Sequence, residues 1–167
     1  QRSSSKSSWE AYPTAQNEIL RLTQSQVGYS YRAVVSYVDT HGTREVLYTS
    51  PSETIDNLDD PVQGEVSIVG EPKEGVTLRA LSDSLSDEDG IASISISWET
   101  SKDGRNWIGL NSLSGPVLQL NQSLVGSQIR ARVAVVDNFG IETNLYSQAT
   151  RTVENVNNKP SGRIVIR

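Results

Sequence analysis

The sequence predicts an all-β chain built from tandem antiparallel β-sandwiches, one complete and one partial. Three observations support this prediction. Apolar and small polar residues alternate strictly around Trp98, the chain repeats with a period of 98 residues, and turn-forming residues recur along it. Alternation with period 2 is typical of a half-buried strand, and turn signals at intervals of roughly 8–12 residues are typical of a sandwich.

The clearest predicted strand runs through Trp98. Ile94, Ile96 and Trp98 alternate with three serines, so one face of the strand is apolar and the other is small and polar. The Asp103-Gly104 pair that follows readily supplies the positive φ angles of a hairpin turn, and Trp107 then begins a returning strand. We therefore expect Trp98 to lie in the core of a sandwich.

An internal repeat organises the whole chain. Trp9 and Trp107 lie 98 positions apart, and sliding the chain by that distance aligns much of the remainder without a gap. The aligned residues include Leu20, Leu22, Arg32, Ala33, Val35, Asp39, Leu47 and Tyr48, which recur as Leu118, Leu120, Arg130, Ala131, Val133, Asp137, Leu145 and Tyr146. In this register, residues 1–58 are the C-terminal part of one repeat, 59–157 are a complete repeat, and 158–167 are a linker and the first strand of a third. Because the chain also contains no methionine, we expect it to be a piece of a longer protein.

The complete repeat is predicted to contain seven short strands and no helix. The strands run at about Glu65–Val69, Val76–Ser82, Ile94–Glu99, Trp107–Leu110, Val117–Leu120, Gln128–Val136 and Leu145–Val153. The segments DNLDDPV (56–62) and ENVNNKP (154–160) join the repeats. Both are short and closed by proline, which favours stiff joints over flexible tethers.

Composition excludes several classes of function. The chain of 167 residues carries a net charge of −5, so it has no basic field with which to hold nucleic acid or an anionic membrane. The absence of cysteine excludes disulfides and thiolate chemistry, and no apolar run approaches the roughly 20 residues of a membrane span. The single histidine, His41, lies in a turn motif with no nucleophile marked beside it, and no phosphate-binding or metalloprotease motif is present. We therefore predict that the protein is not an enzyme.

Three motifs resemble a known group of repeats. They are LSDEDG at 85–90, WETSKDGRNW at 98–107 and VVDNFG at 135–140. Together they resemble the tandem immunoglobulin-like and cadherin-like repeats of large bacterial surface adhesins and RTX-type exported proteins. The resemblance implies an immunoglobulin-like sandwich, a location outside the cell or on the bacterial surface, and a part in cell adhesion. The junction at 153–160 is also similar to a calcium-binding cadherin linker, but it has asparagines where cadherins place aspartates, which would weaken a metal site.

An acidic cluster is expected where the chain enters the complete repeat. In an immunoglobulin-like sandwich, the loop between the second and third strands and the loop between the sixth and seventh lie at that end. Seven carboxylates should therefore converge with the entering linker, namely Asp56, Asp59, Asp60, Asp87, Glu88, Asp89 and Asp137. Such a cluster fits Ca²⁺, which takes 6–8 oxygen ligands. The alternative is that these are ordinary solvated turn residues, because Asp and Gly are common in turns.

Two functions remain open from the sequence. The first is a structural module that spaces and stiffens a long extracellular array, with neighbouring repeats of the same chain as its partners. The second is a binding module for a carbohydrate or a cell-surface protein. Few aromatic residues fall outside the predicted core, which favours the structural function.

The partial repeat is expected to leave an apolar face uncovered. Residues 1–58 supply only the later strands of a sandwich, so the apolar side chains of Leu20, Leu22, Tyr31, Ala33 and Val35 should be exposed. At the other end, Gly162–Arg167 reads as a lone first strand. We expect neighbouring material, from the same long chain or from another copy, to complete both ends.

Overall fold

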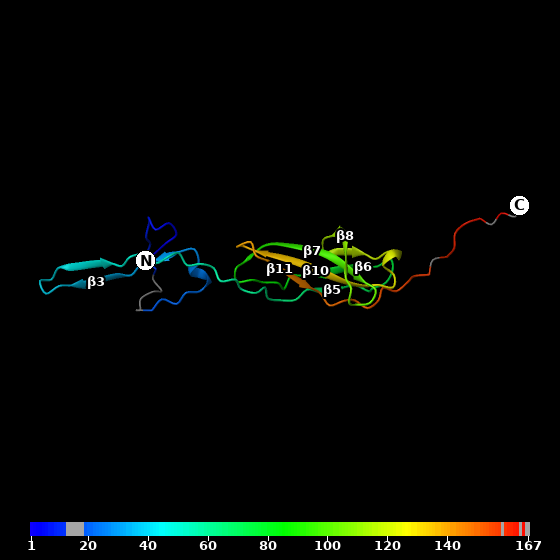
Figure 1. Cartoon of the computed structure of the whole chain (residues 1–167), viewed down its shortest axis with the longest axis horizontal. Helices are drawn as coiled ribbons and strands as arrows, with labels where there is room; N and C mark the ends of the chain where they lie inside the picture. Colours follow the sequence, from blue (N-terminus) through cyan, green and yellow to red (C-terminus); the bar gives the residue numbers. More distant parts are fainter. Residues whose placement is uncertain (13–18, 158, 164, 166–167) are drawn as a thin grey trace. The chain divides into compact units, whose positions relative to one another are not determined.

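The computed structural model describes residues 1–12, 19–157, 159–163 and 165. The chain divides into two compact units, Gln1–Asp59 and Asp60–Arg167 (Figure 1). The regular elements of both units are mainly strands, and the helical elements of the described residues are two single 3₁₀ turns, η1 (Gln24–Gln26) and η2 (Gln122–Leu124). The predicted all-β class is confirmed.

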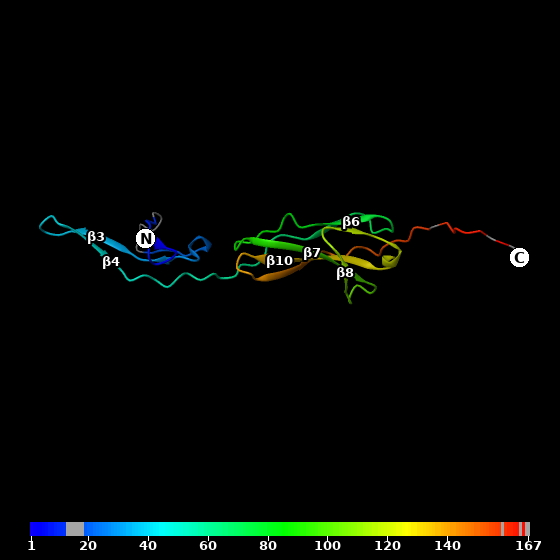
Figure 2. The ribbon, with the colours of Figure 1, turned by 90° about the horizontal axis from the view of Figure 1, so that it is seen from above.

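The second unit is an antiparallel sandwich. One sheet has the strand order β11-β10-β7-β8 and the other β5-β6-β9, and every pair within them is antiparallel. Figure 2 shows β6 in one layer and β7, β8 and β10 in the other. The strands are β5 (Ser67–Val69), β6 (Thr77–Leu81), β7 (Ile91–Ser101), β8 (Ile108–Ser114), β9 (Val117–Gln119), β10 (Gln128–Asp137) and β11 (Glu142–Tyr146).

Trp98 lies in the core between the two sheets, as predicted. Its side chain has no exposed surface, and its indole N–H donates a hydrogen bond of 2.9 Å to the carbonyl oxygen of Gly115. The core around it is formed by Val66, Leu78, Ala80, Leu118, Leu120, Leu124, Ile129, Ala131, Val133, Val135 and Val153. The predicted apolar face of β7 is only partly buried, since Ile94 is 41% exposed. The strands of the facing sheet have three to five residues against eleven in β7, so they are too short to cover all of it.

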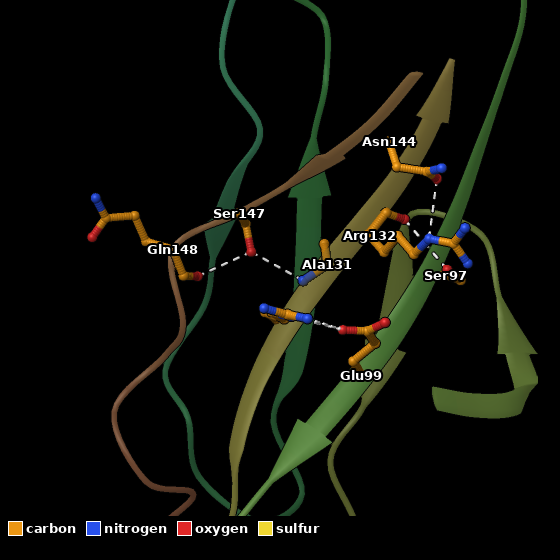
Figure 3. Close-up of polar contacts among 8 residues, drawn as sticks. Ser97, Glu99, Ala131, Arg132, Asn144, Ser147 and Gln148 are labelled. Carbon is orange, nitrogen blue, oxygen red and sulfur yellow. Dashed lines mark hydrogen bonds and ion pairs between the residues drawn. The ribbon is translucent and has the colours of Figure 1, made fainter. Parts of the chain in front are cut away.

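The last predicted strand, Leu145–Val153, is wrong in its extent, because β11 ends at Tyr146. Beyond Tyr146 two hydroxyl groups replace backbone carbonyls as acceptors for β10. The amide of Ala131 donates to Ser147 Oγ (2.9 Å), and the amide of Ile129 donates to Thr150 Oγ1 (3.0 Å). Figure 3 shows Ser147 between Ala131 and Gln148. The segment therefore stays beside β10 without forming a regular ladder.

The first unit reproduces the second half of the sandwich. Its strands are β1 (Arg2–Ser3), β2 (Ser30–Tyr31), β3 (Val34–Val38) and β4 (Arg44–Tyr48), which form two antiparallel pairs. β3 pairs with β4 in the register of β10 with β11, since Val34 faces Tyr48 as Arg132 faces Tyr146. β1 pairs with β2 in the register of β7 with β10, since Arg2 faces Tyr31 as Thr100 faces Ile129. The repeat seen in the sequence is thus a repeat of strand pairing.

Of the apolar residues expected to be exposed in the first unit, Leu22, Ala33 and Val35 are exposed, while Leu20 and Tyr31 are partly buried. Leu22 is 52% exposed and Val35 is 53% exposed, whereas their counterparts Leu120 and Val133 are at most 1% exposed. The difference arises because the described residues of the first unit include no counterpart of the sheet formed by β5, β6 and β9.

Candidate metal centre

Three carboxylates come together beside the first residue of the second unit. Asp59, Asp89 and Asp137 each offer one oxygen, and these oxygens lie within 4.8 Å of one another. Asp89 and Asp137 are buried, with 3% and 4% of their surface exposed, while Asp59 is exposed. These three residues can hold a metal ion.

Asp89 is positioned by the turn in which it lies. The amide of Asp89 donates to Asp87 Oδ1 (2.8 Å), and the amide of Gly90 donates to the carbonyl oxygen of Asp87 (3.1 Å). Gly90 adopts φ +79°, a left-handed conformation that closes the turn and favours glycine. The Oδ2 atom of Asp89 accepts a 2.9 Å hydrogen bond from the amide of Asp60, while Oδ1 is buried and has no hydrogen-bond partner among the described residues.

Asp137 is positioned by the end of β10. The pairing of β10 with β7 is irregular between Val136 and Asp137, and a bulge of this kind redirects a side chain. The Oδ1 atom of Asp137 accepts hydrogen bonds from the amides of Phe139 (2.9 Å) and Ile141 (2.7 Å). Its Oδ2 atom is buried, again with no hydrogen-bond partner in the described part of the chain.

The two acidic turns pack directly on each other. The side chain of Asn138 lies so close to Gly90 that a Cβ atom at this glycine would collide with the amide group of Asn138. The φ angle favours glycine at position 90, and an added Cβ would also force the side chain of Asn138 to move. The carboxylates of Asp89 and Asp137 lie in these two neighbouring turns.

The electrostatics of the cluster favour a compensating positive charge. Buried polar atoms in proteins are almost always hydrogen-bonded, and like charges a few ångströms apart repel each other strongly at low dielectric constant. Here one oxygen of Asp89 and one of Asp137 are buried with no hydrogen-bond partner, and Asp59 adds a third carboxylate. A donor set of carboxylate oxygens is the kind that hard cations such as Ca²⁺ and Mg²⁺ take, and it offers nothing to a metal that prefers sulfur or imidazole.

The structure separates the seven predicted ligands into groups. Asp59, Asp89 and Asp137 provide the clustered oxygens. Asp60 contributes its backbone amide to Asp89, and Asp87 shapes the turn, so both act on Asp89 without belonging to the cluster. Asp56 and Glu88 are exposed and lie outside the cluster.

One signal in the sequence could have singled out Asp137. Buried residues occupy every second position of β10 from Ile129 to Val135, and Asp137 continues that series inward. An aspartate at a position that the alternation assigns to the interior is a stronger ligand candidate than one in a turn.

In each unit one tryptophan and one tyrosine stack against a shared arginine. The guanidinium of Arg130 lies 4.3 Å from the ring centre of Trp107 and 4.4 Å from that of Tyr146. In the first unit Arg32 lies at 4.4 Å from Trp9 and 4.5 Å from Tyr48. Arginine thus occupies a ring surface that a stacked sugar would need.

The chain matches no protein-family model, no curated protein and no solved structure. Within the described residues, no helix has the length and apolar character that a membrane crossing would require.

Proposed function

We propose that this protein is a structural module of a long extracellular array, in which Ca²⁺ bound by Asp59, Asp89 and Asp137 fixes the direction in which the chain enters the second unit. The partners are neighbouring repeats of the same long chain. The observation that carries the proposal is the pair of buried carboxylate oxygens, Asp89 Oδ1 and Asp137 Oδ2, beside a third carboxylate.

The chain's own residues explain how such a site would stiffen a joint. The amide of Asp60 already holds the entering segment to Asp89, and Gln63 pairs through its backbone with Ser86, next to the same turn. A cation shared with Asp59 would extend this attachment by one residue into the linker. Calcium sites in extracellular modules bind in the range of about 10⁻⁴–10⁻³ M, where ligand charge and rigidity set the affinity.

The strand pairing supports the array. The strands of two consecutive repeats pair in the same register at equivalent positions 98 residues apart. The repeats are joined by a short linker that contains Pro61. A linker of this kind limits the freedom of whatever follows it.

The alternative function, a carbohydrate-binding module, has less support. Sugar sites use open aromatic faces, whereas Trp9 and Trp107 each stack against an arginine.

Isothermal titration calorimetry on the whole chain tests the calcium site. We expect saturable binding of one Ca²⁺ by the wild type and its loss in Asp89→Asn, which keeps the acceptor for the amide of Asp60 but removes the charge. Asp83→Asn is the matched control, because Asp83 is an exposed aspartate of the same unit outside the cluster. Equal binding by Asp89→Asn and wild type, or no binding by the wild type at millimolar calcium, would refute the site.

A further inference from the structure

The segment that leaves the first unit is fastened to it by a side chain. Its backbone pairs with the unit at Ile55, whose amide donates to the carbonyl oxygen of Tyr29 (2.9 Å) and whose carbonyl oxygen accepts from the amide of Gly28 (2.9 Å). Two residues further on, Asn57 Oδ1 accepts a 2.9 Å hydrogen bond from Nε2 of Gln24. Ile55 and Asn57 are both half-buried. The side chain of Asn57 thus carries the attachment two residues past Ile55.

Gln24 is placed for this contact by η1, of which it is the first residue. The amide of Thr23 donates to Gln26 Oε1 (2.7 Å), and the amide of Gln26 donates to the carbonyl oxygen of Thr23 (3.0 Å). These two bonds close the turn around Gln24. They hold its backbone where its side chain reaches Asn57, 33 positions further along the chain.

The second unit has the same pair at the same repeat positions. Gln122 opens η2, Asn155 follows Val153 by two residues, and the carboxamide groups of Gln122 and Asn155 lie 3.2 Å apart. The backbone of Val153 is held as that of Ile55 is, with its amide on the carbonyl oxygen of Ser127 (2.8 Å). We call this carboxamide pair the exit clamp of each unit.

The two linkers share the exit clamp but differ in the candidate metal ligand. Asn155 repeats Asn57, whereas Asn157 stands at the position that corresponds to Asp59. A neutral amide in place of a carboxylate weakens a calcium site. The exit clamp is therefore present whether or not the linker carries the carboxylate.

Asp59 lies between two attachments. Asn57, two residues before it, is held by Gln24, and the amide of Asp60, directly after it, donates to Asp89 Oδ2 (2.9 Å). A metal ligand whose backbone is already restricted loses less conformational freedom when the ion binds, so the affinity of the site is higher.

We propose that the exit clamp of the first unit positions Asp59 for the cation. Gln24 and Asn57 are positioning residues, which raise the calcium affinity of a cluster to which neither contributes a carboxylate. This inference rests on the proposed calcium site, but the attachment of the linker by the exit clamp exists without the ion. At the second linker the same clamp holds a segment that has Asn157 in place of the carboxylate.

Amide exchange and ¹⁵N relaxation of the whole chain, measured by NMR in a chelator, test the attachment. Asn57→Ala should speed exchange of the Ile55 amide by about two- to tenfold, the effect of losing one net hydrogen bond beside it, and should increase the ps–ns motion of residues 56–59. Gln122→Ala is the matched control, because it removes the equivalent side chain from the other unit and should change exchange at Val153 but not at Ile55. Unchanged exchange and relaxation in Asn57→Ala would overturn the exit clamp.

Calorimetric titration measures the consequence for calcium. Asn57→Ala should weaken calcium binding by about two- to tenfold, while Gln122→Ala should leave it unchanged. The reversed pair, Gln24→Asn with Asn57→Gln, keeps the total length of the two side chains and should recover both the affinity and the slow exchange. A general loss of folding would not be recovered in this way.

The two measurements separate the possible failures. Equal calcium affinity in wild type and Asn57→Ala, with a more mobile linker in the variant, would overturn the positioning of Asp59. A wild type that binds no calcium would refute the metal site and the positioning role together, while the experiment in chelator would still decide whether Gln24 and Asn57 hold the linker.

Discussion

The guanidinium of Arg130 lies 4.3 Å from the ring centre of Trp107, and Arg32 repeats this relationship with Trp9 at 4.4 Å. Each arginine also stacks on a tyrosine of the neighbouring strand, Arg130 on Tyr146 and Arg32 on Tyr48. The stack therefore links the residue before β8, the strand β10 and the strand β11 on the outer face of the sheet. Its recurrence at 98-residue spacing identifies it as part of the repeat's architecture.

Replacing Arg130 should destabilise the second unit. Two nitrogens of its guanidinium lie 2.6 and 2.7 Å from Glu99 Oε2, so the side chain combines cation–π stacking with an ion pair that is partly shielded from water. We expect Arg130→Lys to lower the free energy of unfolding by about 1–2 kcal/mol. The lysine ammonium group is not planar, so it cannot stack on the aromatic rings and at the same time donate from two nitrogens to Glu99. Urea denaturation of the whole chain measures the change.

Arg132→Lys is the control for this experiment. Arg132 lies two residues away on β10, but its guanidinium is 4.0 Å from Glu142 and both side chains are well exposed. Exposed pairs of this kind contribute little, so the change should stay within about 0.5 kcal/mol. Equal effects of the two substitutions would show that the aromatic stack adds nothing to stability.

Trp98 should be the most sensitive core position. Trp98→Ala removes a side chain with no exposed surface together with its hydrogen bond to Gly115, and we expect a loss of about 3–5 kcal/mol. Thermal and urea melts provide the measurement. The control is Ile108→Ala, which truncates a side chain that is 69% exposed and should cost well under 1 kcal/mol. A similarly small loss for Trp98→Ala would place the indole outside the core.

Much of the fold could be predicted because alternation and repetition are visible in one dimension. The buried positions of β10 follow directly from its period-2 pattern, and the register of β3 with β4 follows from that of β10 with β11. The end of β11 could not be predicted in this way. There Ser147 and Thr150 take over as acceptors, and a hydroxyl can replace a carbonyl without any change in hydrophobic pattern.

The metal cluster could be predicted only as a region. Turn composition located the acidic loops, but it did not separate Asp89, whose carboxylate is buried, from Glu88, which is exposed. That distinction depends on tertiary packing between two loops some fifty residues apart in the sequence, where Asn138 lies against Gly90. Contacts of this kind produce no periodic pattern in the sequence.

Asp103 should make the hairpin between β7 and β8 sensitive to acid. The backbone amides of Asn106 (2.8 Å) and Arg105 (2.9 Å), with the side chains of Asn106 and Ser101, donate to its carboxylate and hold the pKa of Asp103 well below its ordinary value of 3.8. The pKa of Asp103 is lower in the folded than in the unfolded state. The stabilisation that these hydrogen bonds give the folded state is therefore fully present above about pH 4, and it is lost as the pH falls toward the folded pKa.

A pH series with an Asp103→Ala variant isolates this contribution. The difference in unfolding free energy between wild type and variant should be constant from pH 7 to pH 5 and should shrink below pH 4. Removing calcium with a chelator at neutral pH, followed by transfer into calcium-free buffers, keeps any bound cation out of the comparison. A difference that stays constant down to pH 2, or that grows with acid, would contradict the assigned hydrogen bonds.

Asp137→Asn should have opposite effects in the presence and absence of calcium. The substituted amide keeps an oxygen to accept from Phe139 and Ile141, so the turn is preserved. In a chelator, removal of one of three clustered charges relieves repulsion, so the variant should be more stable than wild type by about 1 kcal/mol. In calcium at about one hundred times the dissociation constant, wild type should gain about 2.7 kcal/mol by mass action, and the variant should gain little. The order of the two melting temperatures should therefore reverse when calcium is added. Parallel shifts of both proteins would place the calcium elsewhere, and a variant less stable than wild type in the chelator would show that the apo cluster carries no electrostatic strain.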